Sequence, residues 1–304
     1  MPSSSDVVLV TGATGQQGGA TARALLAAQV PVRALVRDPS SKPARTIEAL
    51  GAELVRADLS DRSSLAPAVE GVRAVFSVQM PPMNGTGADF AGELAQATNL
   101  VDAAKAAGVR QFVQSSTSGV GEHTRAAGWA EGRWAAMADY FHTKQAIMEA
   151  VRGAGFARWT MIKPAFFMEN LPQLAPKGLR GGLLTVLKPD TELALIAVRD
   201  IGTAAAHAFQ DPDRFHRVEL ELAGDLRTMA QIAQTLSAAW DVPVTAPSMT
   251  VEEALAAGMP MWGAGHEWNN VVLQPARPAF ARELGIPLTT FAEWASEQLT
   301  PVSR

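Results

Sequence analysis

The sequence predicts a doubly wound α/β fold, in which helices cover both faces of a parallel sheet. Two observations predict it: short apolar runs alternate with helix-like segments through the first 165 residues, and a glycine-rich turn follows the first run. Strands that alternate with helices pair in parallel through right-handed crossovers. Strands that are apolar throughout fit a sheet buried on both faces.

Each element has its own local signal. Strands are expected where β-branched and apolar residues run together, at Val7–Val10, Val32–Val36, Glu53–Ala57, Ala74–Val78, Gln111–Gln114 and Trp159–Ile162. Helices are expected in the Ala- and Leu-rich stretches between them, at Gly15–Ala28, Arg45–Leu50, Ser63–Val69, Asp89–Ala107 and Tyr140–Arg152. Gly108 is expected to end the longest of these helices as its C′ residue.

The pattern loosens after Pro164, where proline and glycine mark a loop region. Further strands are expected at Leu193–Val198 and Val218–Leu222, and helices at Met229–Trp240, Val251–Ala257 and Phe291–Gln298. We therefore expect residues 1–165 to form the sheet domain, with the strands near 193–222 returning to it. Residues 166–304 are expected to form mostly a smaller, partly interleaved α+β lobe that takes the substrate.

Composition excludes several classes of protein. The 304 residues carry a formal charge of −4, whereas a protein that coats nucleic acid is normally basic, so no direct nucleic-acid partner is expected. The hydrophobic fraction of 47% excludes a mostly disordered chain. No apolar run approaches the ~18 residues of a membrane span, and the polar start predicts no secretory signal, so the expected location is the cytoplasm. Without cysteine or a metal-binding histidine spacing, no metal site is expected.

A glycine-rich turn follows the first strand, with Gly12, Gly15 and Gly18 in a G-x-x-G-x-x-G spacing. The first glycine allows a tight turn, the second lets backbone approach a pyrophosphate, and the third permits close helix packing. The helix that follows directs its free N–H groups toward phosphate, and Thr14, Gln16 and Gln17 belong to the same turn. The context of strand, turn and helix predicts a Rossmann-like dinucleotide site, the alternative being a turn without a ligand.

Residues after the next strands indicate which dinucleotide binds. Arg37 follows the second strand and Lys42 lies nearby, and both cations suit the 2′-phosphate of NADP. Asp38 leaves the alternative of NAD, whose ribose a carboxylate would bind. Asp58 is a candidate for the adenine amino group or, alternatively, a helix cap. Gln79, after the fourth strand, is expected at the same rim.

The catalytic candidates follow the fifth strand. Tyr140 and Lys144 share one face of a predicted helix at i and i+4, so the ammonium is expected to lie near the phenol and favour its ionisation. Tyr140 would then protonate a carbonyl oxygen while hydride arrives, and Lys144 would also bind the nicotinamide ribose. Ser116 is expected to polarise the same oxygen, and Ser115 to contact the cofactor. The alternative is a partly buried tyrosine beside a solvated lysine.

The chain resembles atypical short-chain dehydrogenase/reductases of the NmrA-like group. The matching segments are Thr11–Gly19, Val36–Pro39, Phe112–Ser116, Tyr140–Lys144, Lys163–Leu171 and Val198–Gly202. The resemblance implies NADP(H) binding by the three glycines, Arg37 and Lys42. It also places Lys144, Pro164, Phe166 and Phe167 near the nicotinamide. Asn170 is implied to lie where the cleft meets the smaller lobe, and Trp129 is a candidate for an aromatic substrate wall.

The resemblance leaves more than one function open. The group contains reductases of quinones and other small molecules, and also redox sensors that bind NADP without catalysis. Many members lack the tyrosine of the Tyr-x-x-x-Lys pair, which this chain has at Tyr140. We therefore expect an NADPH-dependent reductase of a small apolar carbonyl or quinone, acting as a monomer or homodimer. The alternatives are an NADP(H) sensor that acts through a protein partner and, less favoured, an isomerase or epimerase.

Overall fold

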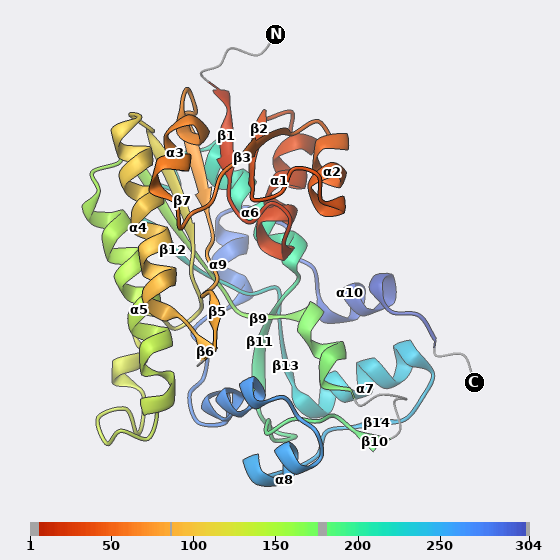
Figure 1. Ribbon diagram of the computed structural model, residues 1–304. Coiled ribbons are helices and arrows are strands. Elements are labelled where there is room, and N and C mark those ends of the chain that lie inside the picture. Colours follow the sequence, from red (N-terminus) through yellow and green to blue (C-terminus); the bar gives the residue numbers. More distant parts are fainter. Residues whose placement is uncertain (1–5, 86, 176–180, 302–304) are drawn as a thin grey trace. The chain divides into compact units, whose positions relative to one another are not determined.

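The computed structural model describes residues 6–85, 87–175 and 181–301 (Figure 1). The chain divides into two compact units. The first extends to Gly121 and also contains Asp139–Lys163 and Val198–Leu220, and the second contains Glu122–Ala138, Pro164–Ala197 and the chain from Glu221 onward. The division after Lys163 lies close to the expected boundary at 165. The segment Glu122–Ala138, which was expected in the sheet domain, groups with the second unit.

The first unit is built on a seven-stranded sheet in the order β12-β8-β7-β4-β1-β2-β3. Its strands are β1 (Val8–Val10), β2 (Val32–Val36), β3 (Glu53–Arg56), β4 (Ala74–Ser77), β7 (Gln111–Ser115), β8 (Arg158–Pro164) and β12 (Val218–Leu222). All neighbouring pairs from β3 to β8 are parallel. The chain winds outward from β1 in one direction and then from β4 in the other, so the predicted doubly wound fold is confirmed. Ligands bind such sheets beyond the carboxyl ends of the strands, where the order reverses.

Only one of the two later strands that were expected in this sheet joins it. Arg217 N, just before β12, donates to Trp159 O of β8 at 2.8 Å, and Ala165 N, just after β8, donates to Leu222 O of β12 at 2.9 Å. Residue numbers rise in the same direction along β8 and β12, so β12 is an edge strand parallel to β8. The expectation is wrong for β11 (Glu192–Ile196), which lies in the second unit because other strands occupy both of its edges.

Helices cover both faces of the large sheet (Figure 1). Helices α3 (Arg62–Val69), α4 (Phe90–Ala106) and α5 (Ala135–Gly153) lie on one face, and α1 (Gln16–Ala27), α2 (Lys42–Ala49) and α6 (Val198–Gln210) lie on the other. Helix α6 packs so closely on α1 that a Cβ on Gly202 would stand 2.4 Å from the carbonyl oxygen of Ala20. A short hairpin of β5 (Met83–Asn84) and β6 (Gly87–Ala88) leads from β4 into α4.

The second unit is mixed α and β, as predicted. Strand β11 pairs in parallel with β9 (Phe166–Phe167) and antiparallel with β13 (Asp225–Thr228), while β10 (Gly181–Gly182) pairs with β14 (Val244–Thr245). Its helices are α7 (Met229–Trp240), α8 (Val251–Ala256), α9 (Pro278–Glu283) and α10 (Phe291–Gln298). Buried leucines and aromatic residues of β11, α7 and α10 form its core. Within the described part of the chain, no helix has the length and hydrophobicity to cross a membrane.

Candidate functional site

The glycine-rich turn connects β1 to α1 at the point where the strand order reverses. Gly12 has a φ of +60°, which favours glycine, and Gly15 N donates to Gly12 O at 2.8 Å to close the turn. A Cβ on Gly18 would stand 2.2 Å from the carbonyl oxygen of Thr11, so only glycine fits there. The Thr11 hydroxyl accepts from Val78 N at 2.9 Å and thereby fixes the turn to the end of β4.

Helix α1 begins at Gln16 directly after this turn, and its N-cap, Gly15, offers no side chain to the first turn. The first N–H groups of the helix therefore have no intrahelical acceptor, and the positive end of the helix dipole lies at the turn. Thr14 and Gln16 are exposed. Gln17 and Ser115, both predicted to contact a cofactor, bond to each other, since Ser115 Oγ donates to Gln17 Oε1 at 2.6 Å. This hydrogen bond links the first turn of α1 to the end of β7.

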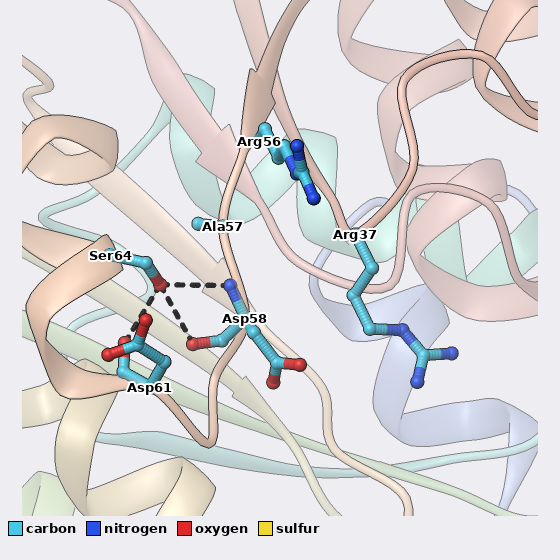
Figure 2. Close-up of a pocket in the computed structure, with 6 residues that line it drawn as sticks. All are labelled: Arg37, Arg56, Ala57, Asp58, Asp61 and Ser64. Atoms are coloured by element: carbon cyan, nitrogen blue, oxygen red, sulfur yellow. Dashed lines mark hydrogen bonds between the residues drawn. The ribbon is translucent and has the colours of Figure 1, made fainter.

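Two basic residues line a pocket of about 410 Å³ beyond β2 and β3 (Figure 2). Arg37 follows β2, and Arg56 ends β3 in register with Val36, the last residue of β2. Asp58 and Asp61 contribute carboxylates to the same pocket. Two guanidinium planes and a carboxylate are groups that can stack on a purine ring and accept a hydrogen bond from its amino group.

Asp38, whose carboxylate left NAD as an alternative cofactor, is already hydrogen-bonded within its own loop. Asp38 Oδ1 accepts hydrogen bonds from Ser40 N at 2.8 Å and Ser40 Oγ at 2.6 Å, in an Asx turn that leads toward α2. These bonds hold the pKa of the Asp38 carboxyl below its ordinary value, with a smaller contribution from the nearby Arg56 charge. Asp38 thus shapes the loop between Arg37 and Lys42.

A second pocket, of about 270 Å³, lies beside the glycine-rich turn. It is lined by Thr14 and Gly15 from the turn, Arg23 from α1, and the start of α2 at Lys42. None of the residues that line it is acidic. Two cations and the N-terminal end of an eight-residue helix make this pocket suited to a phosphate group.

Two further predicted contacts have local partners. Asp58 Oδ1 accepts from Ser60 N at 2.8 Å, and the N-cap of α3 is Asp61, so Asp58 is not the helix cap. Its side chain lines the first pocket. Gln79 is only 5% exposed, and its Nε2 donates to Ser77 Oγ at 2.7 Å. The Gln79 side chain is therefore part of a buried polar network below the rim.

Tyr140 and Lys144 lie one turn apart on α5, and the ammonium is bonded elsewhere than to the phenol. Lys144 Nζ donates to Glu93 Oε1 of α4 at 2.5 Å and lies 5.9 Å from the centroid of the Tyr140 ring. The ring of Phe90 meets the Tyr140 ring edge to face at 6.2 Å. Lys144 thus lies near the aromatic ring of Tyr140, as predicted, but its ionic partner is Glu93.

Ser116 follows β7 at the same carboxyl edge of the sheet. Its N–H donates to Ile162 O at 2.8 Å, which fixes the backbone to β8. Its Oγ is buried and has no hydrogen-bond partner among the described residues. Ser115, by contrast, uses its hydroxyl for Gln17. Of these two serines, Ser116 retains a hydroxyl for a ligand.

The remaining predicted residues belong to the second unit. Pro164 ends β8 at the start of this unit, and Phe166 and Phe167 form β9. The ring of His266 meets Phe166 at 5.2 Å and Trp262 at 5.4 Å, both edge to face. Burial lowers the pKa of His266 to about 4, so its imidazole is neutral at pH 7.

Trp129 and Asn170 were predicted to contact a substrate. The Trp129 ring packs edge to face on His123 at 4.7 Å and on Trp268 at 6.0 Å, within an aromatic cluster of the second unit. Asn170 Oδ1 accepts from Gln173 Nε2 at 3.4 Å in a 3₁₀ turn. Both side chains are half-buried, and their contact with a substrate stays a prediction.

Three charged residues of these sites were not predicted. Arg23 lies seven residues after Gln16 and so returns to the same face of α1 after two turns, a periodicity that could have identified it. Arg56 could have been found from its place at the carboxyl end of a predicted strand. Glu93 is 51 residues from Lys144 and gave no signal of its partner.

Fold and site together define a doubly wound α/β protein with the architecture of a dinucleotide-binding domain. The sequence profile of the NmrA-like family matches residues 4–267, and the chain belongs to this family. An NAD(P)H azoreductase of Xenophilus azovorans is 30% identical over 299 residues, covering 95% of this chain and 96% of the relative.

Solved structures agree in fold. An NADPH-dependent quinone oxidoreductase of Escherichia coli, complexed with NADPH, has a TM-score of 0.73 at 24% identity and covers 96% of this chain and 99% of its own. The negative transcriptional regulator NmrA in complex with NADP has a TM-score of 0.72 at 20% identity, with 97% and 96% covered. At these identities the two structures establish the shared fold alone.

Proposed function

We propose that the protein is an NADPH-dependent oxidoreductase that reduces a small apolar acceptor, either a carbonyl compound or a quinone. The observation that carries the proposal is the basic pocket beside the glycine-rich turn, where Lys42 and Arg23 meet with no acidic residue in the lining. A phosphate on the adenosine ribose is what distinguishes NADP from NAD, and cations recognise it.

The residues present fit this cofactor along the carboxyl edge of β1 to β3. Gly15 and the free N–H groups of α1 would hold the pyrophosphate. Arg37, which was predicted to bind the 2′-phosphate, lines the larger pocket with Asp58, so these two residues would hold the adenine end. The 2′-phosphate would lie on Lys42 and Arg23. Asp38, which would be the ribose ligand in an NAD enzyme, is engaged with Ser40.

Bound NADPH would supply a hydride to the electrophilic atom of the acceptor. Tyr140 would deliver a proton to the acceptor oxygen, so that a carbonyl becomes an alcohol. Ser116 would donate its otherwise unpartnered hydroxyl to the same oxygen. Since the ammonium of Lys144 bonds to Glu93, we assign this lysine to the nicotinamide ribose rather than to activation of the phenol.

The relatives support reduction over other activities. The azoreductase that matches nearly the full chain is named for NAD(P)H-dependent reduction. Several fungal relatives are named NmrA-like oxidoreductases, one of them 29% identical over 75% of this chain. The azo group and the quinone are both flat, conjugated acceptors, so azo compounds belong beside quinones and carbonyls in a substrate panel.

The test is NADPH oxidation against quinones, aldehydes, ketones and an azo dye, with wild type and Tyr140→Phe in parallel. We expect turnover of at least one acceptor, with a carbonyl losing about 10²-fold or more in the variant as the acid is removed. Turnover of a quinone with full activity in Tyr140→Phe would retain the oxidoreductase and reject the tyrosine as acid. Tight NADPH binding without turnover of any acceptor would favour a cofactor sensor instead.

A further inference from the structure

The buried ion pair between Glu93 and Lys144 is the feature of the first unit that the proposed catalysis leaves unexplained. The Glu93 side chain is fully buried and that of Lys144 is 13% exposed, and their charged atoms are 2.5 Å apart. A carboxylate in the interior is costly unless its partners compensate for the lost water.

Stability alone does not account for this pair. The second carboxylate oxygen of Glu93, Oε2, is buried and has no hydrogen-bond partner among the described residues. A buried pair that is only partly satisfied is commonly no more stable than apolar side chains of the same size. The place of Glu93 in the first turn of α4 favours a negative charge, because the positive end of the helix dipole lies there.

The pair determines where the lysine ammonium lies. A lysine side chain is long and adopts many rotamers, so a fixed counter-charge restricts it. Glu93 holds Nζ at 5.9 Å from the centroid of the Tyr140 ring, next to the aromatic face of the predicted acid. An ammonium has three N–H donors, and Glu93 takes one; the described residues accept no other hydrogen bond from it.

We propose that Glu93 is a positioning residue: its buried carboxylate fixes the ammonium of Lys144 so that two N–H donors are presented to the ribose of the nicotinamide half of the cofactor. The proposal rests on the function proposed above, in which Lys144 binds that ribose. Glu93 itself does not touch the cofactor. Its effect on cofactor affinity passes through Lys144 alone, and this dependence makes the proposal testable.

The test is a double-mutant cycle on the dissociation constant of NADPH, with Glu93→Gln, Lys144→Met and the double variant. Glutamine keeps the shape of the side chain but removes the charge. We expect Lys144→Met to weaken NADPH binding about tenfold, as for loss of charge-assisted hydrogen bonds. Glu93→Gln should weaken it several-fold, and the double variant should bind no worse than Lys144→Met.

A matched control is Glu149→Gln on α5, an exposed glutamate bonded to Gln145 at 2.8 Å, which should leave NADPH affinity unchanged. Glu93→Asp, which keeps the charge but withdraws it by one methylene, is a second variant if Glu93→Gln fails to fold, and it should also weaken binding. Unfolding curves of each variant establish that the folded protein is being titrated.

The outcomes separate the inference from the function on which it rests. If Lys144→Met weakens NADPH binding while the folded Glu93 variants bind as wild type, the positioning role is wrong and the lysine contact stands. If the effects of Glu93→Gln and Lys144→Met simply add, Glu93 acts by another route and the inference is also wrong. If Lys144→Met leaves the affinity unchanged, the lysine contact with the cofactor fails first.

Discussion

Replacing Gly18 by alanine tests whether the turn between β1 and α1 is the phosphate cradle. The added Cβ would stand 2.2 Å from Thr11 O and 2.4 Å from Gly12 O. Both neighbours are backbone atoms that cannot rotate away. Ordinary contact begins at 3.4 Å, so the start of α1 must retreat from the turn by about 1 Å.

The retreat has two measurable consequences. Overpacking of this kind costs about 1–3 kcal/mol of the free energy of unfolding. It also carries the N–H groups of the first helical turn away from a bound pyrophosphate, and loss of one charge-assisted hydrogen bond is worth about 1.5–3 kcal/mol, or roughly 10- to 100-fold in the Kd of NADPH. Urea denaturation measures the first quantity, and titration of nicotinamide fluorescence measures the second.

Gly19→Ala is the matched control. It adds the same methyl group one residue further along α1, where the Cβ would stand 3.2 Å from Ala13 O and the neighbour needs to move by only a few tenths of an ångström. We expect this variant to bind NADPH like wild type. If Gly18→Ala is destabilised yet binds NADPH with wild-type affinity, the turn is a packing element and does not hold the phosphates.

Three further predictions concern charge. Lys42→Ala and Arg23→Ala should each raise the Kd of NADPH about tenfold and leave the Kd of NADH unchanged. An equal loss of affinity for both cofactors would contradict the phosphate assignment. The folded protein keeps His266 neutral down to about pH 4, whereas the unfolded chain takes up its proton below about 6.5. Stability should therefore fall by up to about 3 kcal/mol as pH drops through that window, and urea curves of His266→Gln should lack this loss, with exposed His142→Gln as control. Lys144→Met should cost about 3 kcal/mol in the same assay because it leaves a buried carboxylate unpaired, and a cost near zero would contradict that.

The main sheet could be predicted because its signals are local. Buried runs such as Val8–Val10 and Val32–Val36 alternate with helices, and this alternation alone implies parallel pairing. The glycine-rich turn could be predicted because backbone conformation at Gly12 and close packing at Gly18 each require glycine. The hydrogen bonds from Ser40 to Asp38 could also have been predicted, since Asp-x-Ser is a sequence typical of an Asx turn.

Other features depend on which distant segments meet. The strand at 192–196 has the same apolar character as those of the large sheet, and nothing within it indicates that β9 and β13 are its partners. The i and i+4 spacing correctly placed Tyr140 and Lys144 on one face of α5, but a spacing cannot identify a competing partner on another helix. Glu93, in the first turn of α4, carries no sequence signal of burial, yet it is fully buried.

The central claim is that the protein transfers a hydride from NADPH to an acceptor, and isotope transfer tests it most directly. Wild-type protein would be incubated with NADPH deuterated at the hydride-donating carbon and with the acceptor that turns over fastest in the panel. When that acceptor is a ketone or aldehyde, its alcohol product should carry one deuterium on the former carbonyl carbon, and transfer should fall sharply in Tyr140→Phe. An alcohol product without deuterium, or NADPH that stays bound and unoxidised with every acceptor, would contradict the account.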